Sequence, residues 1–471
     1  MLGMEHQKNI TETEAFINSL RSFSLFEKEG DIFISRSPGR LDVMGGIADY
    51  SGSLMLEMPI REATKVALQK SKSRIIEIIS ESNGEVLKFA MPLDDFFIDG
   101  KPIDYENARN YFNHTPENHW ASYICGVFIV LAKEKGIGFN EGVKIYVSSE
   151  IPLGKGVSSS AALEVAVMQA VCGAFEVEID SREKAILCQK VENLVVGAAC
   201  GVMDQMSVMF GEENKLFSLL CQPAEIQGWV EIPEDIEFWG IDSDVRHAVV
   251  GADYSSVRIG AFMGYRIICE LAGFDVKPTE TKGLIKINDS KWNGFLCNIT
   301  PSEFEQFYAS KLPNEILGSE FLAKYQGTTD SVTTIDQNKI YSVKIPTAHA
   351  VYENFRVKTF GEILKSSKPN LKLLGELMFQ AHASYSACGL GEFGTNLIVE
   401  LVRENNAKDL FGAKITGGGS GGTVAVLAKK GSEKVIEELV EKYHAETGKV
   451  PYIFKGSSNG SAAFGVLKIT L

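Results

Sequence analysis

The sequence lacks a surplus of basic residues, and this absence excludes one broad class of partner. Its 47 Lys and Arg stand against 61 Asp and Glu, which gives a formal net charge of -14 at pH 7. A broad nucleic-acid-binding face needs clustered Lys and Arg, so we expect no nucleic-acid partner. An anionic substrate would have to be held locally, by a metal ion, a few cations or a helix N-terminus.

The sequence also has no long apolar run and no paired cysteine motif. The longest apolar run, Tyr123 to Ala132, is too short to span a bilayer, and Met1 to Thr13 lacks the apolar core of a signal peptide. The eight cysteines include no CxxC pair and no Cys/His spacing typical of a metal site, which predicts reduced thiols that pack as small core residues. We therefore predict a cytoplasmic protein with no membrane partner.

Length is informative, because 471 residues exceed the size at which one hydrophobic core keeps growing. Two domains are the default expectation, and we place them at residues 1–216 and 217–471. The sequence contains no low-complexity tract and no repeat of fixed period, which argues against a solenoid or a propeller. The mixed order of strands and helices in the last third predicts an α+β second domain.

Periodicity and residue types predict the main elements. The expected strands cover Asp31–Arg36, Thr64–Leu68, Arg74–Ile79, Gly142–Ser148, Ile236–Ser243 and Thr423–Ala428. The expected helices cover Ala161–Phe175, Ser181–Val196, Tyr254–Leu271, Asn370–Ala387, Glu392–Asn405 and Glu433–His444. Ser181 is a favourable residue type for the N-cap of its helix.

The strongest local signal is the segment Pro152-Leu-Gly-Lys-Gly-Val-Ser-Ser-Ser-Ala-Ala162, which stands just before an expected buried helix. Glycines let backbone N–H groups surround an anion, the helix N-terminus adds about half a positive charge, and serine hydroxyls can reach phosphate or Mg²⁺. This is not a Walker A loop, because the Lys-Ser/Thr pair that ends that motif is absent. The loop alone leaves two interpretations open: a phosphate site, or a Gly/Ser-rich turn into a helix.

Three further segments, taken with this loop, resemble the GHMP kinases. Ser37-Pro-Gly-Arg-Leu-Asp-Val-Met-Gly-Gly-Ile-Ala-Asp-Tyr50 resembles the first GHMP motif in its galactokinase form, the loop at Pro152 the second, and Lys414-Ile-Thr-Gly-Gly-Gly-Ser-Gly-Gly-Thr423 the third. Cys200-Gly-Val-Met-Asp-Gln205 is similar to the segment that carries the catalytic aspartate of galactokinases. Within the family the resemblance narrows to L-arabinokinases, at Gly39–Pro59, Ser255–Gly264 and Ser420. Plant L-arabinokinases carry an additional glycosyltransferase-like N-terminal half, so we expect this chain to correspond to the kinase half alone.

The resemblance implies an α+β, two-domain GHMP kinase fold, with an N-terminal ribosomal S5 domain 2-like domain, a C-terminal ferredoxin-like domain and the active site between them. It implies ATP and Mg²⁺ as cofactors and a small-molecule sugar as substrate. The implied catalytic residues are Asp204, which would deprotonate or orient a sugar hydroxyl, and Arg40 beside it, which would stabilise the transferred phosphoryl group. The implied Mg²⁺ ligands are Ser160 and Glu192, whose oxygen atoms suit this cation.

Other residues implied by the resemblance surround the sugar, the nucleotide and the third motif. The sugar-binding residues are Asp49, Gly46, Ile47, Gly201 and Tyr254. The ATP-binding residues are Gly154, Lys155, Gly156, Val157, Ser158, Ser159, Ser160 and Ala161, and those of the third motif are Gly417, Gly418, Gly419 and Ser420. The polar and aromatic segment from Tyr105 to Trp120 either caps the sugar site or simply joins two elements.

The chain departs from galactokinases at the position that faces the exocyclic group of the sugar. Galactokinases have Gly-Glu-His-Thr-Asp-Tyr where this chain has Gly45-Gly-Ile-Ala-Asp-Tyr50, so two polar side chains are replaced by Gly46 and Ile47. In the family these side chains lie toward the C6 hydroxymethyl of galactose, and L-arabinopyranose lacks that group. Galactose would bury its O6 hydroxyl without a hydrogen-bond partner, which costs about 1 to 3 kcal/mol. This cost corresponds to a roughly ten- to hundredfold preference for L-arabinose over galactose.

The sequence therefore predicts an ATP-dependent sugar 1-kinase that makes L-arabinose 1-phosphate. Two alternatives stay open at this point. One is a galactokinase that makes galactose 1-phosphate, and the other is a catalytically silent, galactokinase-like sugar sensor. The oligomeric state does not follow from the sequence.

Overall fold

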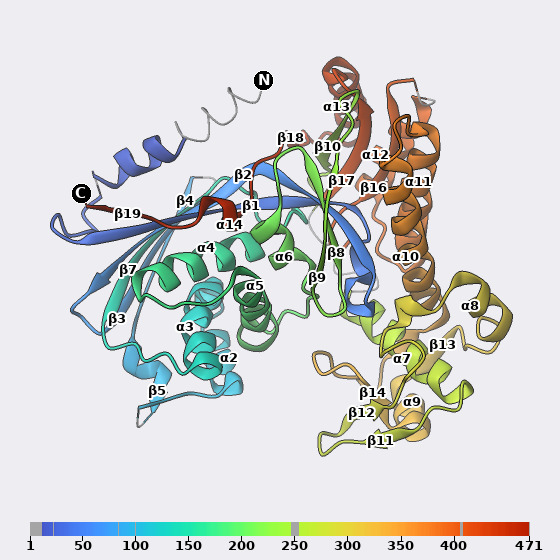
Figure 1. Ribbon diagram of the computed structural model, residues 1–471, viewed down its shortest axis with the longest axis horizontal. Coiled ribbons are helices and arrows are strands. Elements are labelled where there is room, and N and C mark those ends of the chain that lie inside the picture. The colour runs from blue at the N-terminus through green and yellow to red at the C-terminus, as the bar shows by residue number, and fades with distance from the viewer. Residues whose placement is uncertain are drawn as a thin grey trace.

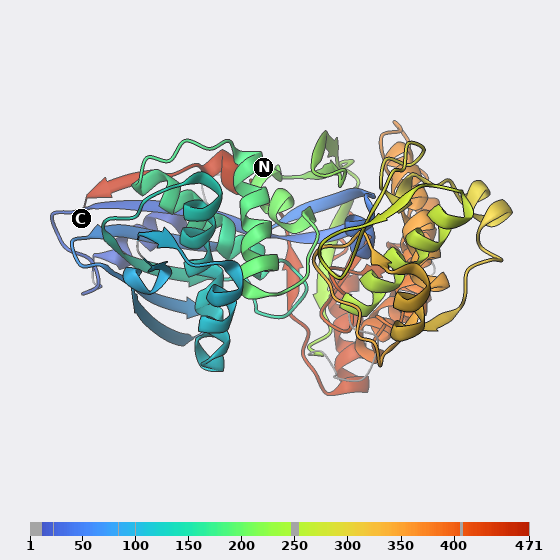
Figure 2. The same ribbon diagram turned by 90° about the horizontal axis from the view of Figure 1, so that it is seen from below.

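Two halves of the molecule, each with its own sheet, are joined by long antiparallel strands. The computed structural model describes residues 12–21, 23–82, 84–98, 100–245, 254–405 and 408–470. Strands β1 (Asp31–Met44) and β2 (Leu54–Ser71) pair along most of their length and run from the first half toward the second (Figures 1 and 2). The segment Met1 to Thr13, considered above for a signal peptide, lies almost wholly outside the described residues.

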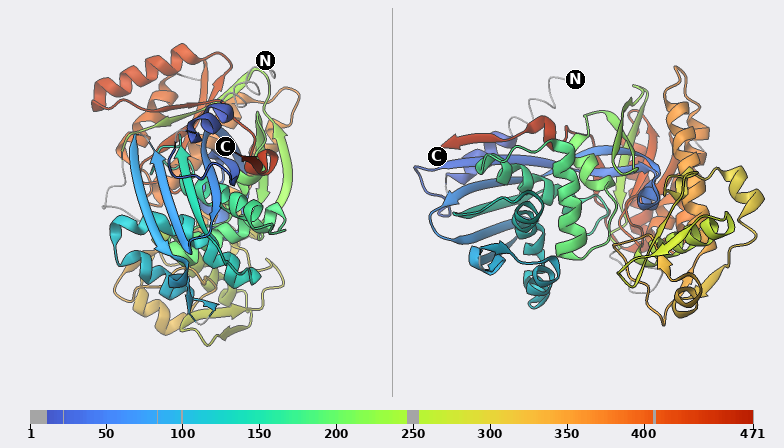
Figure 3. Two further views of the ribbon diagram at one scale, coloured as in Figure 1. Left: turned by 90° about the vertical axis from the view of Figure 1, so that its left-hand side faces the viewer. Right: turned by 60° about the horizontal axis from the view of Figure 1, so that its bottom comes forward.

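The first sheet has the strand order β19-β1-β2-β7-β3-β4, and only its β3–β7 pair is parallel. Its other strands are β3 (Ile75–Ser82), β4 (Glu85–Pro92), β7 (Gly142–Ser149) and β19 (Leu467–Thr470). Strand β8 (Lys215–Leu220) pairs with β2, and β9 (Glu225–Glu231) pairs with β8. The last strand of the chain thus lies beside the first one (Figure 3).

Helices cover one face of the first sheet. Successive side chains along each strand point to opposite faces of the sheet, so both faces carry buried side chains. Phe33 faces the core under these helices, whereas its neighbours Ile32 and Ile34 face a second cluster that includes Phe16 and Leu20 of the helix at residues 12–20. The covering helices are α2 (Tyr105–Asn113), α3 (Ser122–Lys135), α4 (Ser159–Ala174), α5 (Ser181–Lys190) and α6 (Met203–Phe210) (Figure 1). Short elements in this half are η1 (Gly46–Ser51), η2 (Leu93–Phe96), β5 (Phe97–Ile98), β6 (Lys101–Pro102), η3 (Pro116–Ala121) and η4 (Val191–Val196).

The second sheet has the order β16-β17-β10-β18 and is entirely antiparallel. It consists of β10 (Ile236–Asp242), β16 (Leu410–Ile415), β17 (Thr423–Lys429) and β18 (Ile453–Lys455). Helices α10 (Lys344–Leu364), α11 (Leu371–Ala387), α12 (Phe393–Glu404) and α13 (Glu433–Thr447) pack around it, and α14 (Ser461–Phe464) precedes the last strand (Figure 1).

An outer lobe completes the second half of the molecule (Figure 1, yellow). It is built on α7 (Tyr254–Leu271), which packs against α10 through a cluster of apolar side chains around Trp292. Its smaller elements are β11 (Val276–Pro278), β12 (Gly283–Ile287), η5 (Leu296–Asn298), α8 (Pro301–Phe307), β13 (Glu315–Leu317), α9 (Gly318–Tyr325), β14 (Gly327–Thr328) and β15 (Ile340–Ser342).

The predicted α+β organisation in two domains is confirmed, and the expected strands and helices are present, with one correction. The helix expected at Ser181–Val196 spans these residues, as α5 up to Lys190 and then as the π-helical turn η4. Its N-cap is Asp180, whose carboxylate accepts a hydrogen bond from the Glu183 N–H, so Ser181 was the wrong N-cap. The division after residue 216 stays a prediction, since β8 and β9 continue the first sheet beyond it.

All eight cysteines lie within the described residues and are free thiols. Among the described residues, no helix combines the length and the apolar character that crossing a membrane requires.

Candidate active site

A cavity of about 160 Å³ lies where three segments meet. They are the turn at residues 45–50 (the first-motif turn), the segment before α6, and the turn at residues 416–422 (the third-motif turn). Its lining residues are Arg40, Gly46, Ile47, Asp49, Ala199, Cys200, Gly201, Met203, Asp204, Tyr254, Gly417 and Gly418. The structure thus brings together residues that are far apart in the sequence and that were singled out for sugar binding or catalysis. Ala199, Cys200 and Met203 were not singled out, although they flank Gly201 and Asp204 in the chain.

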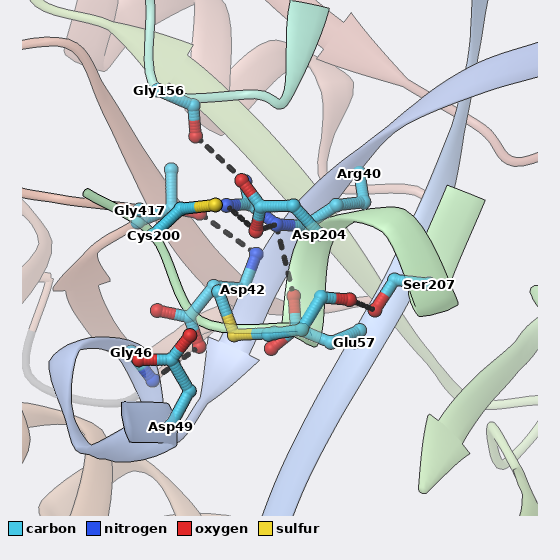
Figure 4. Close-up of polar contacts among 12 residues, drawn as sticks. Arg40, Asp42, Gly46, Asp49, Glu57, Gly156, Cys200, Asp204, Ser207 and Gly417 are labelled. Atoms are coloured by element: carbon cyan, nitrogen blue, oxygen red, sulfur yellow. Dashed lines mark hydrogen bonds and ion pairs between the residues drawn. The ribbon is translucent and has the colours of Figure 1, made fainter. Parts of the chain in front are cut away.

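Arg40 is the central charged group of the cavity (Figure 4). Strand β1 carries it, and both its Nε and its Nη2 contact the same oxygen of Asp204, Oδ1, at 3.1 and 2.6 Å. Its Nη1 donates to the Gly156 carbonyl of the phosphate-loop segment at 2.8 Å. Burial acts to lower the pKa of Arg40, but the nearby carboxylates, Asp204 foremost, outweigh it and leave the pKa raised. Arg40 is therefore a fixed positive charge that joins the loop to Asp204.

Glu57 also lies against Arg40, and sequence reasoning missed it. This residue of β2 is fully buried, with its Oε2 3.2 Å from the Arg40 Nε. Burial and the nearby Asp42 carboxylate raise the pKa of Glu57 well above its ordinary value, and among the carboxylates around Arg40 it is Asp204 that raises the pKa of Arg40 most. The only local sign of a special role for Glu57 in the sequence is that it is a charged residue within the apolar run Leu54–Ile60.

Asp49 and Gly201 form a tight contact on the opposite side of the cavity. A Cβ at Gly201 would lie 1.7 Å from the Asp49 Oδ2, so only glycine fits there. The Asp49 Oδ1 accepts a hydrogen bond from the Tyr50 N–H at 2.7 Å and lies 3.5 Å from the Tyr254 hydroxyl. Burial, followed by the Asp204 charge, raises the pKa of Asp49 to about 7. Hydroxyl groups that donate to this carboxylate would favour its charged form.

A buried ion pair holds the turn that contains Gly46. The Asp42 Oδ1 accepts from the Gly46 N–H at 3.1 Å, and its Oδ2 lies 2.6 Å from the Lys414 Nζ (Figure 4 shows Asp42 and Gly46). The side chains of Asp42 and Lys414 are both completely buried. Both residues lie within the quoted motifs, but they are 372 positions apart, so nothing in the sequence indicated that they pair.

Arg258 ties the outer lobe to the cavity wall. Its Nη1 donates to the Cys200 carbonyl at 3.1 Å, while Nε and Nη2 form a two-pronged ion pair with Asp330 at 2.9 and 2.7 Å. Asp330 belongs to the polar stretch between α9 and β15. The backbone just before Gly201 is thereby anchored to residues that sequence reasoning left without a role.

The phosphate-loop segment abuts the third-motif turn. Gly154, Gly156 and Ser158 have φ angles of 71°, 72° and 60°, which bend the loop before α4 begins at Ser159. A Cβ at Gly417 would lie 2.8 Å from the Gly156 carbonyl oxygen, and a Cβ at Gly156 would lie 3.0 Å from the Thr416 carbonyl oxygen, so the two segments approach closely because both positions are glycine.

Not every residue singled out from these two motifs faces the cavity. The Lys155 ammonium is held by Asp242 at 2.6 Å and Asp244 at 2.8 Å, which neutralises it locally. Gly419 packs against Leu390, and the Ser420 N–H donates to the Leu390 carbonyl at 2.6 Å. Val157 and Ala161 are buried apolar residues. The segment from Tyr105 to Trp120 forms α2 and η3, and none of the cavity's lining residues comes from it.

A group of carboxylates lies beside the start of α4. Gln205 Nε2 donates to the Oε2 of Glu192 at 2.7 Å and to the Oε2 of Glu164 at 3.2 Å. Burial and the Asp204 charge raise the pKa of Glu192 to about 7, although the side chains of Ser160, Cys200 and Gln205 act to lower it. The Glu164 Oε1 is buried without a hydrogen-bond partner among the described residues.

This donor set fits a magnesium ion. It offers carboxylate and hydroxyl oxygens, including a buried one without a partner, beside a loop suited to phosphate. In the part of the chain that the structure describes, no three His, Cys, Asp or Glu side chains are arranged to hold a metal ion by themselves. Mg²⁺ at Ser160 and Glu192 would therefore need further ligands from phosphate and water, as this cation commonly does.

Two family models match the chain. "GHMP kinases N terminal domain" matches residues 122–212, and "GHMP kinases C terminal" matches residues 362–445. The L-arabinokinase of Arabidopsis thaliana is 48% identical in an alignment that covers 94% of this chain and 47% of that protein. The chain thus spans about half the length of this curated relative.

Solved structures with the same fold include two kinases. The galactokinase of Lactococcus lactis, complexed with galactose, aligns with a TM-score of 0.67 at 19% identity, over 93% of this chain and 95% of that one. The mevalonate kinase of Methanococcus jannaschii aligns with a TM-score of 0.53 at 17% identity, over 90% and 98% of the two chains. At these identities the likeness shows the fold alone.

Proposed function

We propose that this chain, which belongs to the GHMP kinases, transfers the γ-phosphoryl group of ATP to the anomeric hydroxyl of L-arabinose. The ion pair between Arg40 and Asp204 is the observation that carries the proposal, because it joins a cavity of sugar size to the phosphate-loop segment. Phosphoryl transfer needs a group that orients or deprotonates the attacking hydroxyl and a positive charge for the developing phosphoryl charge. Asp204 and Arg40 supply these two functions.

In the proposed reaction, the sugar hydroxyl donates its proton to Asp204. Both contacts of Arg40 go to Oδ1, so Oδ2 is the oxygen that accepts this proton. Arg40 then stabilises the negative charge on the phosphoryl oxygens as they approach the sugar. The Gly156 carbonyl and Glu57 keep the guanidinium in place, so that little reorganisation is needed when charge develops.

The nucleotide phosphates would lie at the loop before α4, where backbone N–H groups and the helix N-terminus favour negative charge. Ser160 and Glu192 would hold Mg²⁺, which supplies neutralisation of the phosphate charge when bound. Glu192 has to be ionised for this task, and its raised pKa of about 7 makes cation binding weaker at acidic pH.

Two sets of cavity residues would select the sugar, one by binding its ring hydroxyls and the other by facing its exocyclic group. Asp49 and Tyr254 would bind ring hydroxyls, since a buried carboxylate is a strong acceptor for them. Ile47 is buried and apolar, so it offers no side-chain partner to an exocyclic hydroxyl. Burying the O6 of galactose there without a partner costs about 1 to 3 kcal/mol, which corresponds to roughly ten- to hundredfold in kcat/KM.

A panel of sugars in an ATP-coupled assay tests the proposal. The panel comprises L-arabinose, D-fucose, galactose, galactosamine and glucuronate, and we expect kcat/KM to be higher for L-arabinose and D-fucose than for galactose. D-fucose carries a methyl group where galactose carries a hydroxymethyl group, so it separates the cost of the hydroxyl from that of size. A higher kcat/KM for galactose than for L-arabinose would refute the proposed substrate.

A further inference from the structure

Tyr385 lies directly behind the wall of the cavity, although sequence reasoning gave it no role. It belongs to α11 and is completely buried. Its hydroxyl oxygen accepts a hydrogen bond from the Ile47 N–H at 2.9 Å and lies 3.1 Å from the Gly417 carbonyl oxygen. A third contact joins it to the Asp42 Oδ2 at 3.4 Å. The single hydroxyl therefore contacts both the first-motif turn and the third-motif turn.

The same hydroxyl fills the space that a side chain at position 46 would occupy. A Cβ at Gly46 would lie 1.4 Å from the Tyr385 hydroxyl oxygen and 2.4 Å from the ring carbon that carries it. Gly46 also has a φ of 50°, a backbone conformation that favours glycine. Tyr385 and any side chain at position 46 are thus mutually exclusive in this arrangement.

The two turns that Tyr385 joins both line the cavity and meet at its hydroxyl group. Ile47 lines it from the first-motif turn, and Gly417 lines it from the third-motif turn. The ring of Tyr385 is itself held, with the Lys414 Nζ 5.3 Å from its centre and the His349 ring at right angles to it, 5.4 Å away. A fixed ring and a shared hydroxyl set the distance between the two walls.

We infer that Tyr385 is a positioning residue that sets sugar selectivity, because its hydroxyl holds the Gly46–Ile47 turn at the distance from Gly417 that suits a sugar without an exocyclic hydroxymethyl group. The inference rests on the proposed function, in which the C5 edge of the sugar faces Gly46 and Ile47. Removing the ring opens space directly behind Gly46, so the turn can retreat toward α11 and admit a larger sugar. Removing only the hydroxyl releases the Ile47 N–H and the Gly417 carbonyl but leaves the ring in place.

Two substitutions at this position separate these effects. For Tyr385→Phe we expect KM for L-arabinose to rise by roughly tenfold, from the loss of two modest hydrogen bonds, while kcat changes by less than about threefold. For Tyr385→Leu we expect the ratio of kcat/KM for galactose to that for L-arabinose to rise by about tenfold or more. A merely structural role would lower activity on both sugars alike and leave this ratio unchanged.

A double-mutant cycle tests the exclusion between the two positions. Gly46→Ala should lose about hundredfold or more in kcat/KM for L-arabinose, and Gly46→Ala combined with Tyr385→Leu should recover at least about tenfold of that loss. Gly136→Ala is the matched control, since Gly136 has a φ of 67° and no heavy atom within 4 Å of an added Cβ. It measures the cost of the backbone conformation alone.

A second control and a second readout separate the inference from the proposed function. Tyr146→Phe removes the hydroxyl of a buried tyrosine, which donates to the Glu81 Oε2 at 2.7 Å in the first sheet, and it should leave KM for both sugars unchanged. The rise in Tm on adding L-arabinose or galactose reports sugar binding without turnover. If Tyr385→Leu does not fold, Tyr385→Phe tests the inference by itself. Its KM should rise while kcat stays within about threefold, and its rise in Tm on adding L-arabinose should be smaller than that of the wild-type protein.

The outcomes are distinct. If the wild-type protein prefers L-arabinose while folded Tyr385→Leu keeps the wild-type ratio, or the Gly46 and Tyr385 substitutions are additive, the inference is overturned and the proposed function stands. If the wild-type protein phosphorylates and binds neither sugar, both are overturned.

Discussion

Replacing Gly201 by alanine probes the sugar-binding side of the cavity with one added methyl group. The new Cβ would lie 1.7 Å from the Asp49 Oδ2, whereas ordinary van der Waals contact begins near 3.4 Å. Either the carboxylate or the segment before α6 therefore has to move by about 1.7 Å. Gly201 does not adopt a positive φ, so backbone conformation adds little to this cost.

The displacement is large enough to be decisive for catalysis. A misplacement of about 1 Å can cost on the order of hundredfold in rate, so we expect kcat/KM for L-arabinose to fall by at least about hundredfold. The overpacking itself should lower the free energy of unfolding by about 1 to 3 kcal/mol. Both quantities can be measured on the same preparation, by a coupled ATP assay and by urea unfolding.

Gly138→Ala is a matched control for this experiment. Gly138 has no positive φ, and no heavy atom lies within 4 Å of an added Cβ. It should leave both kcat/KM and stability close to wild type. Kinetics of Gly201→Ala within about threefold of wild type would refute the view that Asp49 and Gly201 together shape the sugar site.

Three further predictions concern charged groups. Asp204→Asn should abolish turnover, because the amide cannot accept the sugar proton, while calorimetry still detects nucleotide binding; unchanged turnover would remove Asp204 from its role. The pKa of Glu192 is raised from 4.5 to about 7 by burial and the Asp204 charge, so the stability it contributes below pH 4.5 is lost as pH rises through 7. Glu192→Gln should therefore gain roughly 1 to 3 kcal/mol over wild type in urea unfolding at pH 8 and little at pH 4.5, and an equal gain at both would contradict this cause. Lys414→Met should lower the free energy of unfolding by about 3 to 5 kcal/mol, because it leaves Asp42 buried without its partner; a change under about 1 kcal/mol would argue against an ion pair there.

The local signals in the sequence were sufficient for most elements and for several residues of the site. Helix α7 covers the residues expected for it, Tyr254–Leu271, and α4 begins within two residues of the expected start. Such elements follow from apolar periodicity and from glycine and serine before a helix, which are properties of neighbouring residues. The helix after Asp180 spans the expected residues, but the π-helical form of its last turn, η4, which packs against α2 and α3, did not follow from the residue types.

Contacts between distant segments account for what the sequence left undetermined at the site. Glu57 and Arg258 are charged residues in apolar segments, and only folding shows that one faces Arg40 and the other joins Asp330 to the Cys200 carbonyl. Nor does the sequence indicate that the Lys155 ammonium is neutralised by Asp242 and Asp244.

The sequence by itself determined which residue types are available for the chemistry: a carboxylate at Asp204, a guanidinium at Arg40, and a first-motif turn with Gly46 and Ile47 in place of polar side chains. Only the tertiary structure decided why position 46 has to be glycine. Tyr385 lies 338 residues away from the backbone N–H of Ile47 that it holds, and its hydroxyl occupies the space of the missing side chain. Periodicity and motif spacing carry information over a few turns of chain, whereas exclusion of one atom by another depends on where the whole fold brings them together.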